Sequence, residues 1–434
     1  MKTVKFYTLG CKVNQYETQE IREKLKASGF KEINNGLKAD IYLINTCTVT
    51  SRADTDSLSL VRKAAKENPR AKIIVTGCLT ELDAKKIKAI PGNKLIIRNK
   101  DKASILKILN ENNETNIIGI STFSGHTRAF LKIQDGCNNF CAYCKVPLVR
   151  GRSASRKNPL IIREAEQLVE SGFKEIVLTG ICLGVYGKDL KPKISLTGLI
   201  KELTKIKGLM RIRLSSIEAG DVSRALIQLM ASSKKICRHL HIPIQSGDDQ
   251  ILRKMNRSYT HASYLALIKK IKAAIPGIAI TTDCLVGFPG ESKASFLNTV
   301  KLVQKILPLR THIFPYSPRE GTLAFGFKQE LTSQETKQRT DLLRKISIEC
   351  SRKFQQQFIG KKMDLLVESR DKAMPAYWQG HTDNYLKVLV KSGLDLHNQI
   401  IPIKLTDLSI DNQFFAEYNN KKHGDASVFL NKNN

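Results

Sequence analysis

The chain has 434 residues, of which 41% are hydrophobic, so it is long enough for two or three domains with sizeable cores. It contains no run approaching the ~20 apolar residues of a membrane span, and its start, MKTVKFYTLG, lacks the apolar stretch of a signal peptide. These features argue against a membrane or secreted protein. We therefore expect a cytoplasmic protein with no membrane partner, in which the ten cysteines serve as metal ligands more than disulfides.

The formal net charge of +31 suggests a polyanionic partner such as nucleic acid. The alternative is a lysine-rich bias on a solvated surface. Residues 121–360 carry 39 basic and 18 acidic side chains and therefore most of the excess charge. This concentration favours a nucleic-acid-binding face in the middle of the chain.

The first ~120 residues predict repeated strand–helix units, which imply a doubly wound parallel α/β sheet. A cysteine closely follows each of three predicted strands, and the carboxyl ends of parallel strands meet at one edge. Isolated buried cysteines are common, but the same placement three times favours a three-cysteine metal site. The predicted strands are residues 4–9, 41–45 and 72–76, the helix is 17–28, and the cysteines are Cys11, Cys47 and Cys78.

A polar stretch at residues 111–126 is typical of a linker, and a second cysteine group follows the next predicted strand. Cys137, Cys141 and Cys144 have the spacing C-x3-C-x2-C, with no fourth cysteine nearby. Three thiolates can hold a four-iron cluster and leave one iron without a protein ligand. Zinc is the competing metal, but structural zinc prefers four closed ligands.

Six strand–helix units then predict an incomplete barrel of the (β/α)6, TIM-like type, with its site at the carboxyl ends of the strands. After residue 360 the pattern changes to short apolar runs without helices, which predict a small antiparallel β-barrel or sandwich. The predicted domains are residues 1–120, 127–357 and 358–434. The barrel strands are expected at residues 129–134, 175–178, 210–214, 239–244, 279–285 and 311–314, and the C-terminal strands at 363–368, 384–390 and 399–405.

Basic residues directly follow the second cysteine group, and we hypothesise that they contact RNA phosphates. They are Arg150, Arg152, Arg156 and Lys157. His239 and His241 alternate on one predicted strand and are expected to be packing residues and not metal ligands.

Several strings together resemble the methylthiotransferases of the radical S-adenosylmethionine (SAM) class over nearly the whole chain. They are TLGCKVNQYE, LTGICLGVYG, RLSSIE, HLHIPIQSG, TTDCLVGFPGE and HIFPYSPREGT. The first is most like the branch that acts on tRNA N6-threonylcarbamoyladenosine. The isopentenyladenosine branch tends to have a GCQMN-like string at this place, and the ribosomal-protein branch GCPKN.

The resemblance implies an auxiliary-cluster domain, a radical SAM barrel and a C-terminal TRAM-like β domain. It implies two 4Fe-4S clusters and S-adenosyl-L-methionine as cofactors. Cys137, Cys141 and Cys144 match the ligands of the radical cluster, and Cys11, Cys47 and Cys78 those of the auxiliary cluster. The positions that match cofactor contacts are Gly180, Ser216, Glu218, Gln245 and Glu291, although the GFPG string before Glu291 is equally well explained as a tight turn.

The activity implied is transfer of a methylthio group to N6-threonylcarbamoyladenosine at position 37, in the tRNA anticodon loop, by a monomer that receives electrons from flavodoxin or ferredoxin. The alternatives are isopentenyladenosine tRNA or a ribosomal protein as substrate, a non-catalytic iron–sulfur RNA-binding or redox-sensing protein, and a zinc-bound scaffold. Two features depart from the family. Cys182 stands where a histidine or other polar residue is expected and is predicted to be an inert buried thiol. The C-terminal ~70 residues are nearly neutral, which shifts the expected RNA contacts to the barrel.

Overall fold

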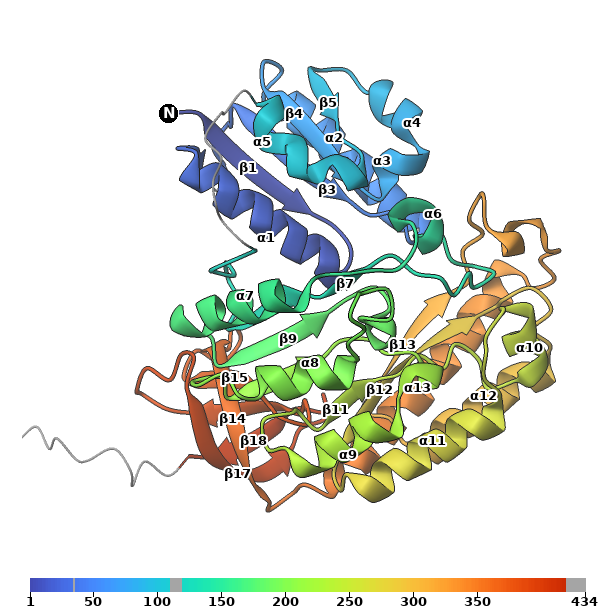
Figure 1. Ribbon diagram of the computed structural model, residues 1–434. Helices are drawn as coiled ribbons and strands as arrows, with labels where there is room; N and C mark the ends of the chain where they lie inside the picture. The colour runs from blue at the N-terminus through green and yellow to red at the C-terminus, as the bar shows by residue number, and fades with distance from the viewer. Residues whose placement is uncertain (34–35, 110–118, 419–434) are drawn as a thin grey trace, which may run out of the picture. The chain divides into compact units, whose positions relative to one another are not determined.

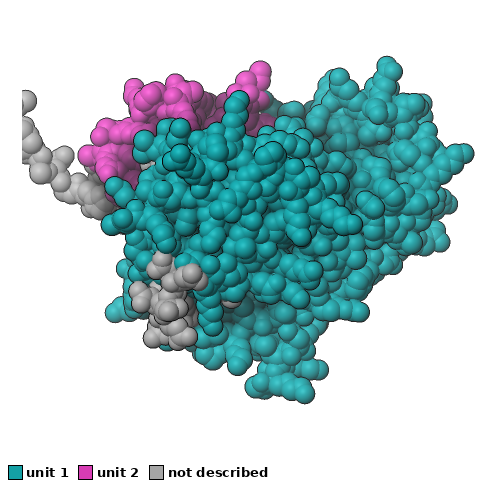
Figure 2. Space-filling model, turned by 90° about the horizontal axis from the view of Figure 1, so that it is seen from above, with its two compact units in different colours: residues 1–354 teal, residues 355–434 magenta. Residues whose placement is uncertain are grey.

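The computed structural model describes residues 1–33, 36–109 and 119–418, in two compact units, Met1–Phe354 and Gln355–Asn434. Figure 2 colours the two units separately. Residues 111–118 of the predicted linker and the asparagine- and lysine-rich tail lie outside the described residues. Among the described helices, none combines the length and apolar character that a membrane crossing requires.

The N-terminal part of the first unit is a five-stranded parallel sheet in the order β2-β1-β3-β4-β5. Alternate residues of its central strands enter different cores: Tyr42 and Ile44 pack with Val61 on one face, and Ile41 and Leu43 pack with Leu25 on the other. Burial on both faces explains the continuous apolar runs in the sequence. The elements are β1 (Thr3–Thr8), α1 (Lys12–Ala27), β2 (Lys31–Glu32), β3 (Ile41–Thr46), α2 (Ser51–Glu67), β4 (Lys72–Gly77), α3 (Leu79–Leu82), α4 (Ala84–Lys88), β5 (Lys94–Ile96), η1 (Asn99–Ser104) and α5 (Ile105–Ile108).

The rest of the first unit is the predicted incomplete barrel. Its six parallel strands form two sheets, β10-β9-β6 and β11-β12-β13, which isolated bridges such as Ser216 to His241 connect between β10 and β11. The helices lie outside these strands (Figure 1). The strands are β6 (Arg128–Lys132), β7 (Gln134–Asp135), β8 (Ala154–Ser155), β9 (Glu175–Thr179), β10 (Arg211–Leu214), β11 (His239–His241), β12 (Ala279–Val286) and β13 (Arg310–Pro315). The helices are α6 (Val146–Arg150), α7 (Asn158–Glu170), η2 (Leu183–Val185), α8 (Leu196–Leu203), η3 (Ala219–Asp221), α9 (Arg224–Ser232), α10 (Asp249–Lys254), α11 (His261–Ala274), α12 (Lys293–Ile306), η4 (Leu323–Gly326) and α13 (Ser333–Gln356).

The second unit contains a small closed barrel in the order β14-β15-β16-β18-β17. Its pairings are antiparallel except for β16 with β18, which run parallel. The fold class predicted from the sequence is thus confirmed, with this one parallel pair as the difference. The strands are β14 (Lys362–Arg370), β15 (Tyr377–Thr382), β16 (Lys387–Lys391), β17 (Ile400–Leu408) and β18 (Phe414–Glu417).

Candidate active site

The structure brings Cys11, Cys47 and Cys78 together at one edge of the N-terminal sheet. They follow β1, β3 and β4, which are consecutive neighbours in the sheet. Gly10 permits the close approach, because its φ is +95° and a Cβ atom there would lie 2.8 Å from the Cys47 Sγ. Burial raises the pKa of the Cys47 thiol and raises that of Cys78 to about 11, so binding a metal here would displace protons. We call this group the sheet triad.

Cys137, Cys141 and Cys144 lie in one loop between β7 and α6, a group that we call the barrel triad. The buried Gln134 side chain braces this loop. Its Nε2 donates to the Gly136 carbonyl oxygen at 2.7 Å, while its Oε1 accepts from the Cys182 backbone nitrogen at 2.8 Å. Gln134 therefore connects the start of the barrel-triad loop to the segment that follows β9.

The thiols of the barrel triad have different electrostatic surroundings. Burial raises the pKa of Cys144 to about 12, and it also raises the pKa of Cys141. The pKa of Cys137 is lowered to about 7, chiefly because the Cys182 thiol donates a hydrogen bond to it. Cys182 is buried, as expected for this position, but it contacts the barrel triad.

Arg257 is a site residue that sequence reasoning missed. Its Nη1 lies 3.1 Å from the Cys141 Sγ, and its Nη2 pairs with the Glu218 carboxylate. Burial raises the pKa of Glu218, and Arg257 opposes this change. The pair thus places one cation and one carboxylate beside the barrel triad, a combination suited to an amino-acid zwitterion.

The other residues matched to cofactor contacts have different surroundings. Ser216 and Gln245 lie at the carboxyl ends of β10 and β11, and Gln245 has a left-handed φ of +58°, a strained value that is common at functional sites. Gly180 packs against Gln134, where a Cβ atom would lie 3.0 Å from the Oε1. Glu291 is buried and accepts hydrogen bonds from the Gly287 backbone nitrogen and from an arginine, Arg339, so its carboxylate closes the GFPG turn. This placement supports the tight-turn interpretation, and a cofactor contact of Glu291 stays a prediction.

Arg150 does not lie on the surface, which corrects its predicted phosphate contact. Its side chain is 1% exposed. The guanidinium lies 3.1 Å from Glu17 Oε1 and 2.9 Å from Asp135 Oδ1, and it also bonds Asn14. A basic run in a sequence does not show which of its members point inward, and here a carboxylate from α1 holds the first one.

Of the other three residues of the basic run, one is paired within the protein and two are exposed. Arg156 pairs with the buried Glu164 at 2.6 Å, so its charge is satisfied within the protein. Arg152 and Lys157 are exposed. The Arg152 guanidinium lies 5.0 Å from the centre of the Phe140 ring, a half-exposed aromatic side chain in the barrel-triad loop.

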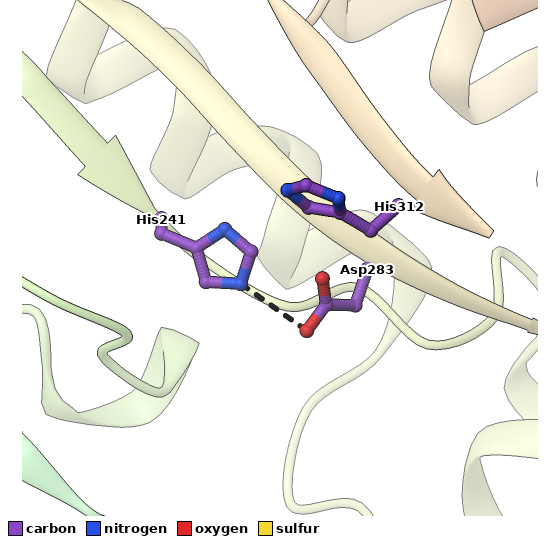
Figure 3. Close-up of side chains that lie close together, drawn as sticks. All are labelled: His241, Asp283 and His312. Carbon is purple, nitrogen blue, oxygen red and sulfur yellow. Dashed lines mark hydrogen bonds and ion pairs between the residues drawn. The ribbon is translucent and has the colours of Figure 1, made fainter. Parts of the chain in front are cut away.

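His241 is grouped with two side chains that sequence reasoning did not connect to it, Asp283 and His312 (Figure 3). Its Nε2 lies 3.1 Å from Asp283 Oδ2, and its Nδ1 lies 2.9 Å from Thr281 Oγ1. Histidine and carboxylate are common metal ligands, and these atoms lie within 4.8 Å of one another. However, both His241 nitrogens already have hydrogen-bond partners, and these bonds account for the arrangement without a metal.

A cavity of about 260 Å³ is lined by one barrel-triad cysteine and by residues that closely follow Cys47 of the sheet triad. Thr50, three residues after Cys47, borders it on one side, and Cys144 borders it on the other. Gln245 and Asp283 line it from the strand ends of the barrel. We call it the inter-triad cavity; a substrate in it would contact Cys144 and the residues that closely follow Cys47.

Comparison with known proteins identifies the family. Residues 3–98 match the uncharacterized protein family UPF0004, and residues 131–303 match the radical SAM superfamily. A Bacillus subtilis protein named threonylcarbamoyladenosine tRNA methylthiotransferase MtaB is 38% identical, over 93% of this chain and 94% of its own length. The chain belongs to the radical SAM methylthiotransferase family. A Thermotoga maritima protein of the same name is 35% identical over 89% and 91% of the two chains, and a Syntrophomonas wolfei tRNA-2-methylthio-N(6)-dimethylallyladenosine synthase is 33% identical over 95% and 97%.

A solved structure shares only the fold with this radical SAM methylthiotransferase. The radical SAM methyltransferase TsrM from Kitasatospora setae, with tryptophan and a SAM analogue bound, superposes with a TM-score of 0.54 at 12% identity, over 72% of this chain and 73% of its own.

Membership in the radical SAM superfamily implies a 4Fe-4S cluster and SAM. The barrel triad fits the cluster chemically, since its three thiols are free, share one loop and lie beside a cation, Arg257. Beside them, the Arg257–Glu218 pair offers partners for the carboxylate and amino groups of SAM. The sheet triad offers a second set of three free thiols.

Proposed function

We propose that the protein is a tRNA methylthiotransferase that converts N6-threonylcarbamoyladenosine at position 37, in the anticodon loop, to its 2-methylthio derivative. The observation that carries the proposal is one cavity lined both by Cys144 of the barrel triad and by Val49 and Thr50, which closely follow Cys47 of the sheet triad. The relatives named for this activity at 35% and 38% identity support the choice of base.

In this proposal Cys137, Cys141 and Cys144 ligate the radical cluster, and the sheet triad ligates an auxiliary cluster. When bound, the clusters and SAM supply a carbon radical and a methylthio group, which no protein side chain offers. Such chemistry is needed because carbon 2 of adenine is neither acidic nor electrophilic enough for ordinary acid–base substitution.

The chain's own residues then position the reactants and exclude water. Arg257 donates to Cys141 and pairs with Glu218, so that one ion pair orients both a ligand thiolate and the amino-acid end of SAM. Gln134 fixes the barrel-triad loop against the strand ends. The Cys144 thiol lies in a buried environment, which limits side reactions with water.

The target base lies in a single-stranded loop and can be turned into a pocket at a lower cost than a duplex base. Arg152 and Lys157 remain our proposed phosphate contacts, because both are exposed. Phe140, beside Arg152, offers a ring on which a neighbouring base can stack. A small electron-transfer protein such as flavodoxin or ferredoxin, a monomeric state, a cytoplasmic location, three domains and a TRAM-like RNA-binding role for the second unit complete the proposal.

Two measurements test it. Anaerobic reconstitution of the wild type should give about eight irons, and replacement of Cys11, Cys47 and Cys78 by alanine should remove about four of them, as expected for two four-iron clusters. The variant should still form 5′-deoxyadenosine from SAM but transfer no methylthio group. An unchanged iron content in the triple variant would disprove the two-cluster arrangement.

The substrate is tested separately, because relatives named for dimethylallyladenosine are nearly as similar, at 33% identity. Nucleoside analysis of tRNA from cells that lack this protein should show N6-threonylcarbamoyladenosine without its methylthio group. Retention of that group, in cells with no second enzyme of this kind, would refute the choice of base. Loss of methylthio from dimethylallyladenosine or from a ribosomal protein would instead identify the alternative substrates.

A further inference from the structure

The inter-triad cavity has a cationic end formed by Lys145 and Arg319. Lys145 follows Cys144 directly, lines the cavity and is only 7% exposed. Among the described residues, no hydrogen-bond or ion-pair partner contacts its amine. The Lys145 amine is not among the buried polar atoms that lack a partner, so it stays accessible, and a negatively charged ligand in the cavity can form a charge-assisted hydrogen bond with it.

Arg319 contributes a second positive charge on the same wall. Its terminal nitrogens are held by Thr48, Ser51 and Asp54, and the Thr48 contacts are 3.0 Å long. Its Nε, however, is buried and has no hydrogen-bond partner among the described atoms. The residue is 5% exposed and lines the cavity, and one donor of its rigid guanidinium has no partner among the described atoms, so a small shift of the side chain could offer it to a ligand.

The carboxylates near this end have other hydrogen-bond partners or lie beyond ion-pair distance of Lys145. Asp283 also lines the cavity, but its Oδ2 is hydrogen-bonded to His241 at 3.1 Å. Asp54 is paired with the terminal nitrogens of Arg319. Burial lowers the pKa of Lys145, while Asp54, Asp83 and Glu320 act to raise it through their charges, but no ion pair joins any of them to its amine among the described residues.

The remaining walls suit a flat ring. Tyr143, Phe314 and Tyr316 line the cavity, and aromatic faces of this kind stack on purines. Its volume of about 260 Å³ is slightly below the ~300 Å³ at which pockets for drug-sized ligands begin. We expect it to enclose the base and its N6 substituent while the ribose and phosphates stay outside.

We propose that Lys145 and Arg319 form a carboxylate subsite that receives the threonyl carboxylate of the substrate base. This inference rests on the proposed function and explains how the site distinguishes two adenosines that carry different N6 groups. A dimethylallyl group would leave both donors without a partner, and a site built for a hydrogen-bonding group rejects an analogue that lacks it.

The test compares two substrates that differ by one charge. The anaerobically reconstituted enzyme is given tRNA with N6-threonylcarbamoyladenosine, or the same tRNA with the threonyl carboxylate converted to a primary carboxamide. A hydrogen bond to a charged group is worth ~1.5–3 kcal/mol, which is roughly a 10- to 100-fold preference in kcat/KM for the carboxylate. Binding of the two free nucleosides to the same protein without reductant should show the same preference, which separates recognition from turnover.

Three variants locate the preference. Lys145→Met should reduce it to about threefold or less by weakening the carboxylate substrate alone, and Lys145→Arg should retain most of it. Lys272→Met is the matched control, because Lys272 is a partly buried lysine of α11 whose amine donates to the Ile306 carbonyl oxygen, outside the cavity. It should keep the full preference. Iron content is measured on each variant, since Lys145 adjoins a proposed cluster ligand.

The outcomes separate this inference from the function on which it rests. Equal wild-type use of carboxylate and carboxamide tRNA would overturn the subsite and leave the proposed function intact, and this result depends on no variant. A full preference in Lys145→Met would overturn the assignment to Lys145. A wild-type enzyme that modifies dimethylallyladenosine tRNA and not the threonylcarbamoyl substrate would overturn the proposed function itself. If Lys145→Met bound both tRNAs equally more weakly but bound the free nucleosides as the wild type does, Lys145 would be a phosphate contact instead.

Discussion

Replacing Arg150 with methionine should destabilise the protein by about 3 kcal/mol, because its charge lies in the interior. The guanidinium contacts Glu17 at 3.1 Å, Asp135 at 2.9 Å and the Asn14 side chain. Removing one partner from a buried ion pair costs ~3–5 kcal/mol. The value should lie at the low end, because Lys132 remains 2.7 Å from Glu17 and 2.6 Å from Asp135.

Thermal unfolding followed by circular dichroism measures this loss. For a chain of 434 residues, about 1 °C per kcal/mol predicts a midpoint about 3 °C lower for Arg150→Met. Arg152→Met is the control, because Arg152 belongs to the same basic run but is exposed, and its midpoint should change by about 1 °C or less. An unchanged midpoint in Arg150→Met, together with a smaller salt dependence of tRNA binding, would refute the buried-network account and restore a phosphate contact.

Three further predictions concern the barrel-triad loop and the charged residues around Arg150. Arg152→Met should lower the slope of log binding constant against log salt by about 1, as loss of one phosphate contact requires, and an unchanged slope would remove Arg152 from the interface. Burial alone would raise the pKa of Glu17, but Lys102, Lys132 and Arg150 hold it well below its ordinary value of 4.5. Glu17 therefore stabilises the fold above that value, the stability is lost as pH falls through the lowered pKa, and Glu17→Gln should flatten the acid side of a stability–pH curve. Gln134→Leu should make about half of the iron easier for a chelator to remove, because the barrel-triad loop loses its brace; uniform iron release would contradict this role.

Much of the fold could be predicted from the sequence because central strands such as β3, β4 and β9 are buried on both faces and are therefore largely apolar runs. The exceptions have local causes. The helix expected to begin at residue 17 begins at Lys12, because its first turns bury polar residues such as Asn14 and Thr18, which disguise the apolar period. β15 (Tyr377–Thr382) contains Gln, Gly and His between its buried residues, and β18 (Phe414–Glu417) is only four residues long. Such strands form because of their pairing with neighbouring strands more than because of their own β-propensity.

The sequence predicted only those parts of the candidate site that follow from the local spacing of cysteines and predicted strands. The cysteines of the barrel triad lie within one short loop, and those of the sheet triad recur at strand ends, so both patterns can be recognised in one dimension. Arg257, in contrast, meets Cys141 across 116 residues, and Arg150 meets Glu17 across 133. A positively charged side chain looks alike in a sequence whether it faces RNA, a carboxylate or a sulfur, and only the folded chain shows which partner it has.

The same long-range contacts determine how the two triads can work together. A carbon radical reacts before it can diffuse away. The base and the sulfur that the base receives must therefore be held within contact distance. The strands cannot ensure this, because the two triads lie on separate sheets. Arg319 can, since its segment lines the cavity while its guanidinium binds Thr48, the residue after Cys47, across 271 residues. One buried guanidinium thus fixes the rim of the sheet triad to the mouth of the barrel, beside the cavity in which we position the substrate's carboxylate.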